Sequence, residues 1–226
     1  MNPIQQLIEQ SDTHEAASLL DARSALLERL QLNRNDCEAM ELLTGIYYWL
    51  GAYAEDDGAR ESYLVQGVDT GKVAAASGQD TLAANFWYAS CMSSLGALRG
   101  LLNSRPFFGP IEKHGKRALK IDETYVQCGP LRLMGDFYSK APPAPHGPGD
   151  KKKGLELARR AVTLNPSKLA NKVVLANAYL AARYFDESRH TVRDILAEPE
   201  PTGSRLSFSL NQAKARGILE RLDRME

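Results

Sequence analysis

The chain has 226 residues, of which 43% are hydrophobic and 25% are charged, a balance typical of a protein with a buried core. Lysine plus arginine (28) equals aspartate plus glutamate (28), so the net charge is zero and a nucleic-acid-binding surface is not expected. The three cysteines, Cys37, Cys91 and Cys128, are far apart, which argues against a disulfide framework and favours reduced thiols.

The amino terminus shows no export signal. Its opening run, MNPIQQLIEQSDTHE, lacks the basic and the apolar segments of a secretory leader. The longest apolar stretch, Ile46–Ala54, is broken by Gly51 and is too short to span a bilayer. These features predict a cytoplasmic protein without membrane insertion. A periplasmic protein whose leader has been removed is the alternative.

Two leading helices are expected in residues 1–34. Leu19, Leu26 and Leu30 recur at helical spacing, and the cap-rich run Ser11–Thr13 divides the segment. Such a segment would pack on the first of the helical hairpins that follow.

A first hairpin is predicted for residues 35–79. Its first helix begins near Cys37, after a polar turn that can supply a cap, and its second helix spans Arg60–Ala76. Gly67 and Gly71 interrupt the second helix, where each glycine costs about 1 kcal/mol relative to alanine.

Residues 80–128 predict a second hairpin. Asp80 is a suitable N-cap for a helix that runs to Leu102. Two prolines mark Ser104–Pro110 as a turn, and Ile111–Ile121 has the pattern of the returning helix.

Two more hairpins and a final helix follow. Residues 129–166 and 167–200 predict the hairpins, and residues 205–226 predict a helix that caps the array. In the earlier of these hairpins, Pro130 is a favourable first helical residue and Asp150 caps the second helix. The rigid insertion APPAPHGPG separates its two helices.

The run GLELARRAVTLNP identifies the type of repeat. Small residues stand at Gly154, Ala158 and Ala161, and Pro166 ends the run, which is the pattern of the second helix of a tetratricopeptide repeat (TPR). The hairpins recur at more than the standard interval of about 34 residues, so long helices or long loops are expected. We therefore predict one all-α domain over residues 1–226, a TPR-like right-handed helical-hairpin solenoid of about four irregular repeats with additional helices at both ends.

Residues 80–222 resemble a known family. They contain the runs KRALKIDETY, LMGDFYSKAPPAPHGPGDKKKGLELARRAVTLNPS and LANAYLAARYFDESRHTVRDIL. These runs resemble bacterial TatT-like TPR proteins, which are associated with TRAP-type transporters for small organic solutes, and they are more weakly similar to the regulator of microtubule dynamics proteins. The resemblance implies an all-helical cup that associates with a partner and holds a small organic or apolar ligand.

The first helix of each hairpin lines the concave wall of such a solenoid, which suits a groove for a peptide, a partner helix or a small ligand. Counted from the small positions, the predicted partner- or ligand-binding residues are Trp49, Asn85, Tyr88, Met92, Arg132, Asp136 and Asn177. Two alternatives stay open. Aromatic side chains at helical spacing also form cores, and Arg132 with Asp136 also suits an exposed i,i+4 pair.

Two features outside this wall are candidates for docking. The loop Pro142–Gly149 is either a rigid docking element or a spacer. Lys151–Lys153 follow it in the first turn of a helix, where the helix dipole disfavours cations. They form either a site that captures an acidic partner or phosphate, or a solvated charge run.

The sequence contains no catalytic, cofactor or metal constellation. Its histidines, His14, His114, His146 and His190, do not stand at metal-ligand spacing, and no nucleophile elbow is present. We predict a non-enzymatic TPR scaffold, without cofactor, that binds another protein or peptide through its concave surface. The alternative is a TatT-like accessory protein that holds a small organic or apolar ligand in solute uptake. Self-association is left open.

Overall fold

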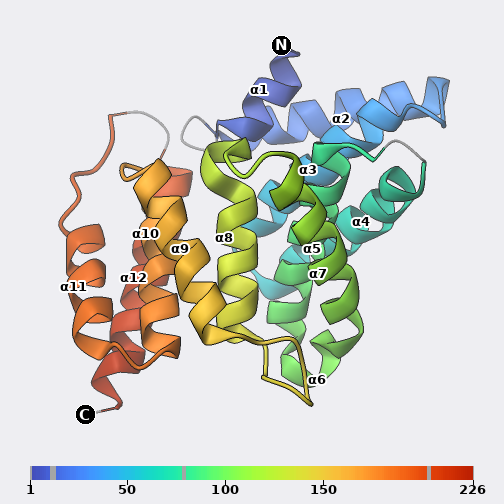
Figure 1. Ribbon diagram of the computed structural model, residues 1–226. Coiled ribbons are helices and arrows are strands. Elements are labelled where there is room, and N and C mark those ends of the chain that lie inside the picture. Colours follow the sequence, from blue (N-terminus) through green and yellow to red (C-terminus); the bar gives the residue numbers. More distant parts are fainter. Residues whose placement is uncertain (1, 11–13, 78–79, 203–204, 226) are drawn as a thin grey trace. The chain divides into compact units, whose positions relative to one another are not determined.

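The computed structural model describes residues 2–10, 14–77, 80–202 and 205–225, and these residues form helices and turns without a strand (Figure 1). The predicted all-α class is confirmed. The chain divides into two compact units, Met1–Asp122 (unit 1) and Glu123–Glu226 (unit 2). The break predicted at Ser11–Thr13, together with the end of the linker before the last helix, lies outside the described residues.

Unit 1 is built from antiparallel helices. The helices and their bounds are α1 (Pro3–Glu9), α2 (Ala16–Leu32), α3 (Cys37–Tyr53), α4 (Asp57–Ala76), α5 (Leu82–Arg99), α6 (Leu101–Ser104), the 3₁₀ turn η2 (Arg105–Phe107) and α7 (Phe108–Ile121). Helix α3 pairs with α4 and α5 pairs with α7, and α4 also packs on α5. Helices α1 and α2 both pack on α3, as predicted for leading helices.

Short polar side chains start the long helices of unit 1. The carboxylate of Asp36 accepts a hydrogen bond from Ala39 N at 2.9 Å and so caps α3. Thr81 caps α5, because its hydroxyl accepts from Ala84 N at 3.1 Å. The prediction that Asp80 caps α5 is therefore wrong by one residue.

The two glycines inside α4 allow three helices to pack closely. A Cβ added at Gly67 would lie 2.6 Å from Cys91 Sγ on α5 and 3.1 Å from Tyr47 Cβ on α3. A Cβ at Gly71 would lie 3.0 Å from both Thr44 and Tyr88. The glycines lower the helix propensity of α4, but they allow it to pack closely against both α3 and α5.

The second hairpin departs from the sequence prediction. Helix α5 ends at Gly100, whose positive φ of 82° favours glycine, and the following residues form α6, η2 and the start of α7. The turn predicted at Ser104–Pro110 is therefore helical. Its prolines are tolerated because Pro106 and Pro110 lie in first turns, where the missing N–H has no intrahelical partner to lose.

Unit 2 continues the hairpin pattern. Its helices are α8 (Tyr125–Lys140), α9 (Lys151–Leu164), α10 (Leu169–Ala181), α11 (Phe185–Leu196) and α12 (Leu206–Asp223). Helix α8 pairs with α9, α10 pairs with α11, and α12 packs on both α10 and α11 (Figure 1). Ala215, Ile218 and Leu222 of α12 join the core formed by α10 and α11, so α12 closes the end of this unit as predicted.

The small residues that identified the repeat lie at the contact between α8 and α9. Ala158 and Ala161 are fully buried, and a Cβ at Gly135 would lie 3.2 Å from Ala158 N. A Cβ at Gly154 would lie 2.8 Å from Ser139 N and would collide with the Ser139 hydroxyl. The TPR pattern therefore reports a backbone-to-backbone approach that larger side chains would prevent.

The loop between α8 and α9 is held by its own backbone. Gly149 N donates to Pro142 O at 2.8 Å, and Asp150 N donates to Tyr138 O at 3.0 Å. Asp150 then caps α9 by accepting from Lys153 N at 3.0 Å, as predicted.

Candidate functional site

In unit 1, the predicted wall residues are largely buried. Met92 is 1% exposed, Asn85 is 5% exposed and Trp49 is 7% exposed. Tyr88 is half-buried, and burial raises the pKa of its hydroxyl. At these positions the first helices α3 and α5 face packed neighbours more than solvent.

Trp49 lies at the centre of an aromatic cluster beneath α1. Its indole N–H donates to Ile8 O at 3.0 Å, and its ring lies 4.6 Å from His14 and 5.5 Å from Tyr53. His14 is fully buried; its Nε2 donates to Leu7 O at 2.5 Å, because a carbonyl can only accept, and its Nδ1 forms a hydrogen bond with the Tyr53 hydroxyl at 3.0 Å. The leading segment thus covers Trp49 and satisfies its donor.

Asn85 belongs to a polar chain that joins α5 to α7. Its Nδ2 donates to Asp80 Oδ1 at 2.9 Å and to Thr81 O at 2.7 Å. Its Oδ1 therefore accepts from His114 Nδ1 at 2.8 Å, which fixes the neutral tautomer of that ring. Burial, and next Lys113, lower the pKa of His114, whereas Asp80 opposes this shift.

In unit 2, the side chain of Arg132 forms hydrogen bonds to backbone carbonyls. Val126, Gln127 and Cys128 have left-handed φ values of 47°, 54° and 69°, so their carbonyls leave the regular pattern of α8. The Arg132 guanidinium donates to the carbonyls of Val126, at 3.0 Å, and of Gln127, and also to Asn171 Oδ1 at 2.9 Å. This side chain therefore ties a strained turn to α10.

The other two predicted residues of unit 2 are more accessible. Asp136 forms an ion pair with Lys140 at 2.8 Å, one helical turn along α8. Asn177 is half-buried on α10, and its Oδ1 accepts from the Arg221 guanidinium at 2.5 Å. Helix α12 thus reaches the face on which Asn177 lies.

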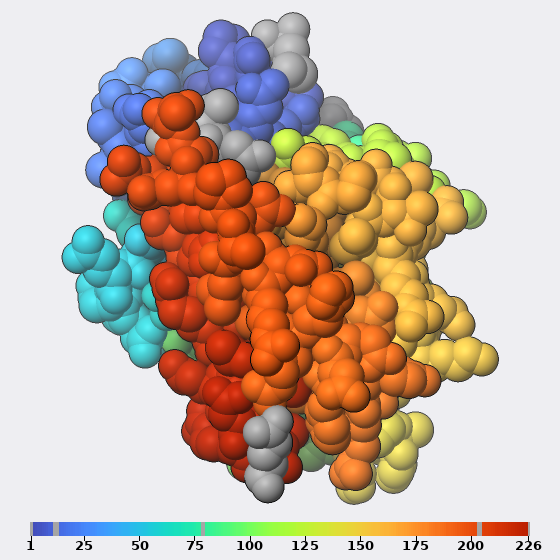
Figure 2. Space-filling model, turned by 90° about the vertical axis from the view of Figure 1, so that its left-hand side faces the viewer, coloured from blue at the N-terminus to red at the C-terminus, as the bar shows by residue number. Residues whose placement is uncertain are grey.

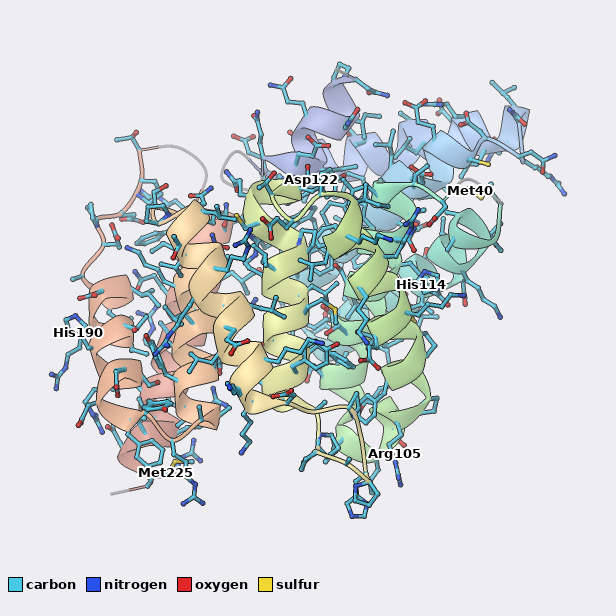
Figure 3. The ribbon with its side chains drawn as sticks, viewed as in Figure 1. Met40, Arg105, His114, Asp122, His190 and Met225 are labelled. Atoms are coloured by element: carbon cyan, nitrogen blue, oxygen red, sulfur yellow. The ribbon has the colours of Figure 1, made fainter. Side chains whose placement is uncertain are left out.

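A pocket of about 640 Å³ lies on this face of unit 2. Five of its lining residues come from the first helices: Ser139 and Lys140 from α8, and Asn177, Leu180 and Ala181 from α10. Phe185 and Met225 add apolar surface from α11 and from the end of α12, where Figure 3 shows Met225. The pocket therefore lies where α8, α10 and α12 end and where α9 and α11 begin.

Four basic residues line this pocket: Lys140, Lys151, Arg183 and Arg221. Arg183 follows α10 with a left-handed φ of 64°, and its N–H donates to Leu180 O at 3.1 Å, which ends that helix. Sequence reasoning singled out Lys151 but missed Arg183 and Arg221. No local pattern marks them, because only the fold brings the ends of α10 and α12 together.

Metal chemistry has no site in the described ranges, where His, Cys, Asp and Glu side chains form no group that could hold an ion. His190 points away from α11 into solvent (Figure 3), and its side chain is 79% exposed. Across the part of the chain that the structure describes, no helix combines the length and apolar character needed to cross a bilayer.

Antiparallel helix pairs, small residues at the pair contact and a closing helix define a TPR-type helical-repeat protein. The crystal structure of TTC0263, a thermophilic TPR protein in Thermus thermophilus, is similar to this chain, with a TM-score of 0.61 and 15% sequence identity. The match covers 87% of this chain and 89% of that one, and it concerns the fold.

The chain belongs to the TAtT family, the T-component of TRAP transporters, whose family pattern matches residues 54–225. The predicted TatT-like membership is thereby confirmed. Comparison with curated proteins gave no match. Family and fold together indicate an accessory protein that works through protein partners, and proteins of this kind are typically non-catalytic.

Proposed function

We propose that this chain is a non-enzymatic accessory protein that binds a partner protein through the face of unit 2 formed by α8, α10 and α12. The observation that carries the proposal is the difference between the candidate residues. Trp49 and Met92 are core residues of unit 1, whereas Asn177 lines a pocket of about 640 Å³ in unit 2. A hollow lined by polar and apolar side chains is the usual form of a binding site.

The family suggests the kind of partner. Because the matching family is the T-component of TRAP transporters, we propose that the partner is another component of such a transporter. Asn177 and Asp136 are the predicted residues that remain accessible for this contact, and Arg132 supports the wall behind them.

Co-purification tests this proposal. The full chain would be tagged and isolated from its own host together with bound TRAP transporter components. The variant Asn177→Arg should lose the partner, because it places a second guanidinium against Arg221, whereas His190→Ala on the outer side of α11 should retain it. Retention by Asn177→Arg with an unchanged circular dichroism spectrum, or the absence of any transporter component, would contradict the proposal.

A small organic ligand is the second candidate, and the size of the pocket favours it. Its volume of about 640 Å³ falls within the range of roughly 300–1,000 Å³ that is usual for small-molecule sites. Native mass spectrometry of the chain purified from its host would detect such a ligand. A bound mass that Asn177→Arg abolishes would support this candidate, and a wild-type chain that carries none would contradict it.

A further inference from the structure

The charge of the pocket in unit 2 is one-sided. Lys140, Lys151, Arg183 and Arg221 line it, and the described lining contains no carboxylate. Of these four, only Lys140 has an acidic partner among the residues that the structure describes, Asp136 on its own helix at 2.8 Å. Within the described chain, Lys151 and Arg183 form no ion pair.

The hydrogen bonds of Arg221 do not reduce this surplus of positive charge. Arg221 donates to Asn177 Oδ1 at 2.5 Å and to Gly217 O at 3.3 Å, which leaves its charge unneutralised.

Helix dipoles explain three of the cations but not the fourth. Lys140, Arg183 and Arg221 lie at or just beyond the carboxyl ends of α8, α10 and α12, where positive charge complements the helix dipole. Lys151 is instead the first residue of α9, where the dipole is also positive and disfavours a cation. This end of the pocket therefore carries positive charge that the fold itself does not balance.

Among the described residues, the nearby acidic side chains do not cancel the charge. Asp223 is paired with Arg189 at 2.6 Å. Asp186 and Glu187 occupy the first turn of α11, where they complement its dipole, and neither lines the pocket.

Apolar surface lies beside the cations. Phe185 is 40% exposed and Met225 is 61% exposed, and Leu180 lines the pocket next to them. The neighbouring Tyr184 is 47% exposed. Figure 2 shows α11 and α12 side by side, in orange and red, along this side of unit 2. A ligand that covers this surface must carry apolar groups as well as negative charge.

We propose that the pocket binds an acidic segment of a partner polypeptide, with its carboxylates at Lys151 and Arg221 and an apolar side chain against Phe185 and Met225. This inference rests on the proposed function and names the chemistry of the partner. Opposite charges across such a contact give specificity and speed association, and the apolar contact adds binding energy.

Fluorescence anisotropy of a labelled peptide tests the inference on the full chain. The probe is a fluorescein-labelled Glu-Glu-Leu-Glu-Glu-Leu peptide, compared with the same peptide carrying lysine in place of glutamate. The acidic peptide should bind at least about tenfold more tightly than the basic one, and sodium chloride should weaken its binding. Equal binding of the two peptides, or no binding of the acidic one, would overturn the inference.

Charge reversal locates the contact. Lys151→Glu and Arg221→Glu should each weaken the acidic peptide at least about tenfold. Lys152→Glu and Arg216→Glu are the matched controls, because they reverse exposed charges on the same two helices outside the pocket and should change affinity less than about twofold. Equal losses in variants and controls would show a general charge effect and overturn the site. Lys151→Glu alone decides the matter if Arg221→Glu lowers the melting temperature.

Two further experiments separate a polypeptide ligand from a small carboxylate, and this inference from the proposed function. In the first, succinate competes with the labelled peptide. If succinate displaces it as effectively as the unlabelled peptide does, a small carboxylate suffices and the assignment to a polypeptide is overturned. Transporter components that co-purify through Asn177, while the acidic peptide does not bind, would leave the proposed function standing and reject only this inference.

Discussion

The first helices of the hairpins are used in opposite ways in the two units. In unit 1 the first helix α3 presents Trp49 to α1, and the indole donates to Ile8 O at 3.0 Å. In unit 2 the first helix α10 presents Asn177 to α12, which contributes Arg221 and Met225 and leaves a pocket of about 640 Å³. The comparison teaches that the added helix, more than the repeat, decides whether the wall of a first helix is packed into the core or left open as a pocket.

Close packing enforces the difference. A Cβ at Gly45 would lie 2.8 Å from Ile8 and 3.1 Å from Trp87, so α1 and α5 both press against the middle of α3. Around the pocket, the contacts are made instead by long, charged side chains at helix ends. Side chains of that kind keep their charged ends in solvent and leave space between helices.

The largest expected effect is on the stability of unit 1. Trp49→Ala should lower the free energy of unfolding by about 3–5 kcal/mol, because it empties the centre of the aromatic cluster. The change used for comparison in unit 2, Asn177→Ala, should lower the free energy of unfolding by no more than about 0.5 kcal/mol. Urea denaturation followed by circular dichroism measures both. If both variants lost a similar free energy of unfolding, the distinction between the packed wall of unit 1 and the open wall of unit 2 would be wrong.

A smaller effect is expected where α9 crosses α8. Gly154→Ala should cost about 1–3 kcal/mol, because the new Cβ would collide with the Ser139 hydroxyl and lie 2.9 Å from Gly135 O. Gly217→Ala on α12 is the control, since nothing lies within 4 Å of the added Cβ, and it should stabilise by up to about 1 kcal/mol. Denaturation of both variants in parallel checks the sign, and a stabilising Gly154→Ala would refute the close approach.

The smallest effect concerns pH and the polar chain of unit 1. The pKa of His114 in the folded chain lies below its ordinary value of 6.5, mainly through burial. As pH falls below about 6.5, the unfolded chain binds this proton first, so stability is lost; above that value the ring is neutral in both states. His114→Gln should remove this part of the pH dependence. Denaturation of both proteins on either side of pH 6.5 tests it, and parallel curves would argue against the shift.

The hairpins could be predicted because their signals are local. The small residues from Gly154 to Ala161 and the cap at Asp150 mark one helix, which the structure shows as Lys151–Leu164. Such patterns depend on neighbours within a few turns, which the sequence displays directly.

The candidate site was harder to predict, because the burial and the contacts of its residues depend on segments that are distant in the sequence. Trp49 is buried by a helix that lies some forty positions earlier in the chain. Arg132 was predicted as a residue of the groove wall, and its contact with the carbonyls of the left-handed turn at Val126–Cys128 was not foreseen. The three left-handed residues are not glycines; the only local signal is the Gly129-Pro130 pair that follows them, and it does not show that Arg132 binds the carbonyls of the turn.

The buried thiol of Cys91 has a practical consequence. Its side chain is 0% exposed, its Sγ lies 3.6 Å from Thr44 O, and burial raises the pKa of the thiol. An alkylating reagent can therefore reach it only when α3, α4 and α5 separate. Cys128, which is 2% exposed in unit 2, is protected in the same way. The relative labelling rates of these two native thiols would time the opening of each unit separately, without any introduced probe.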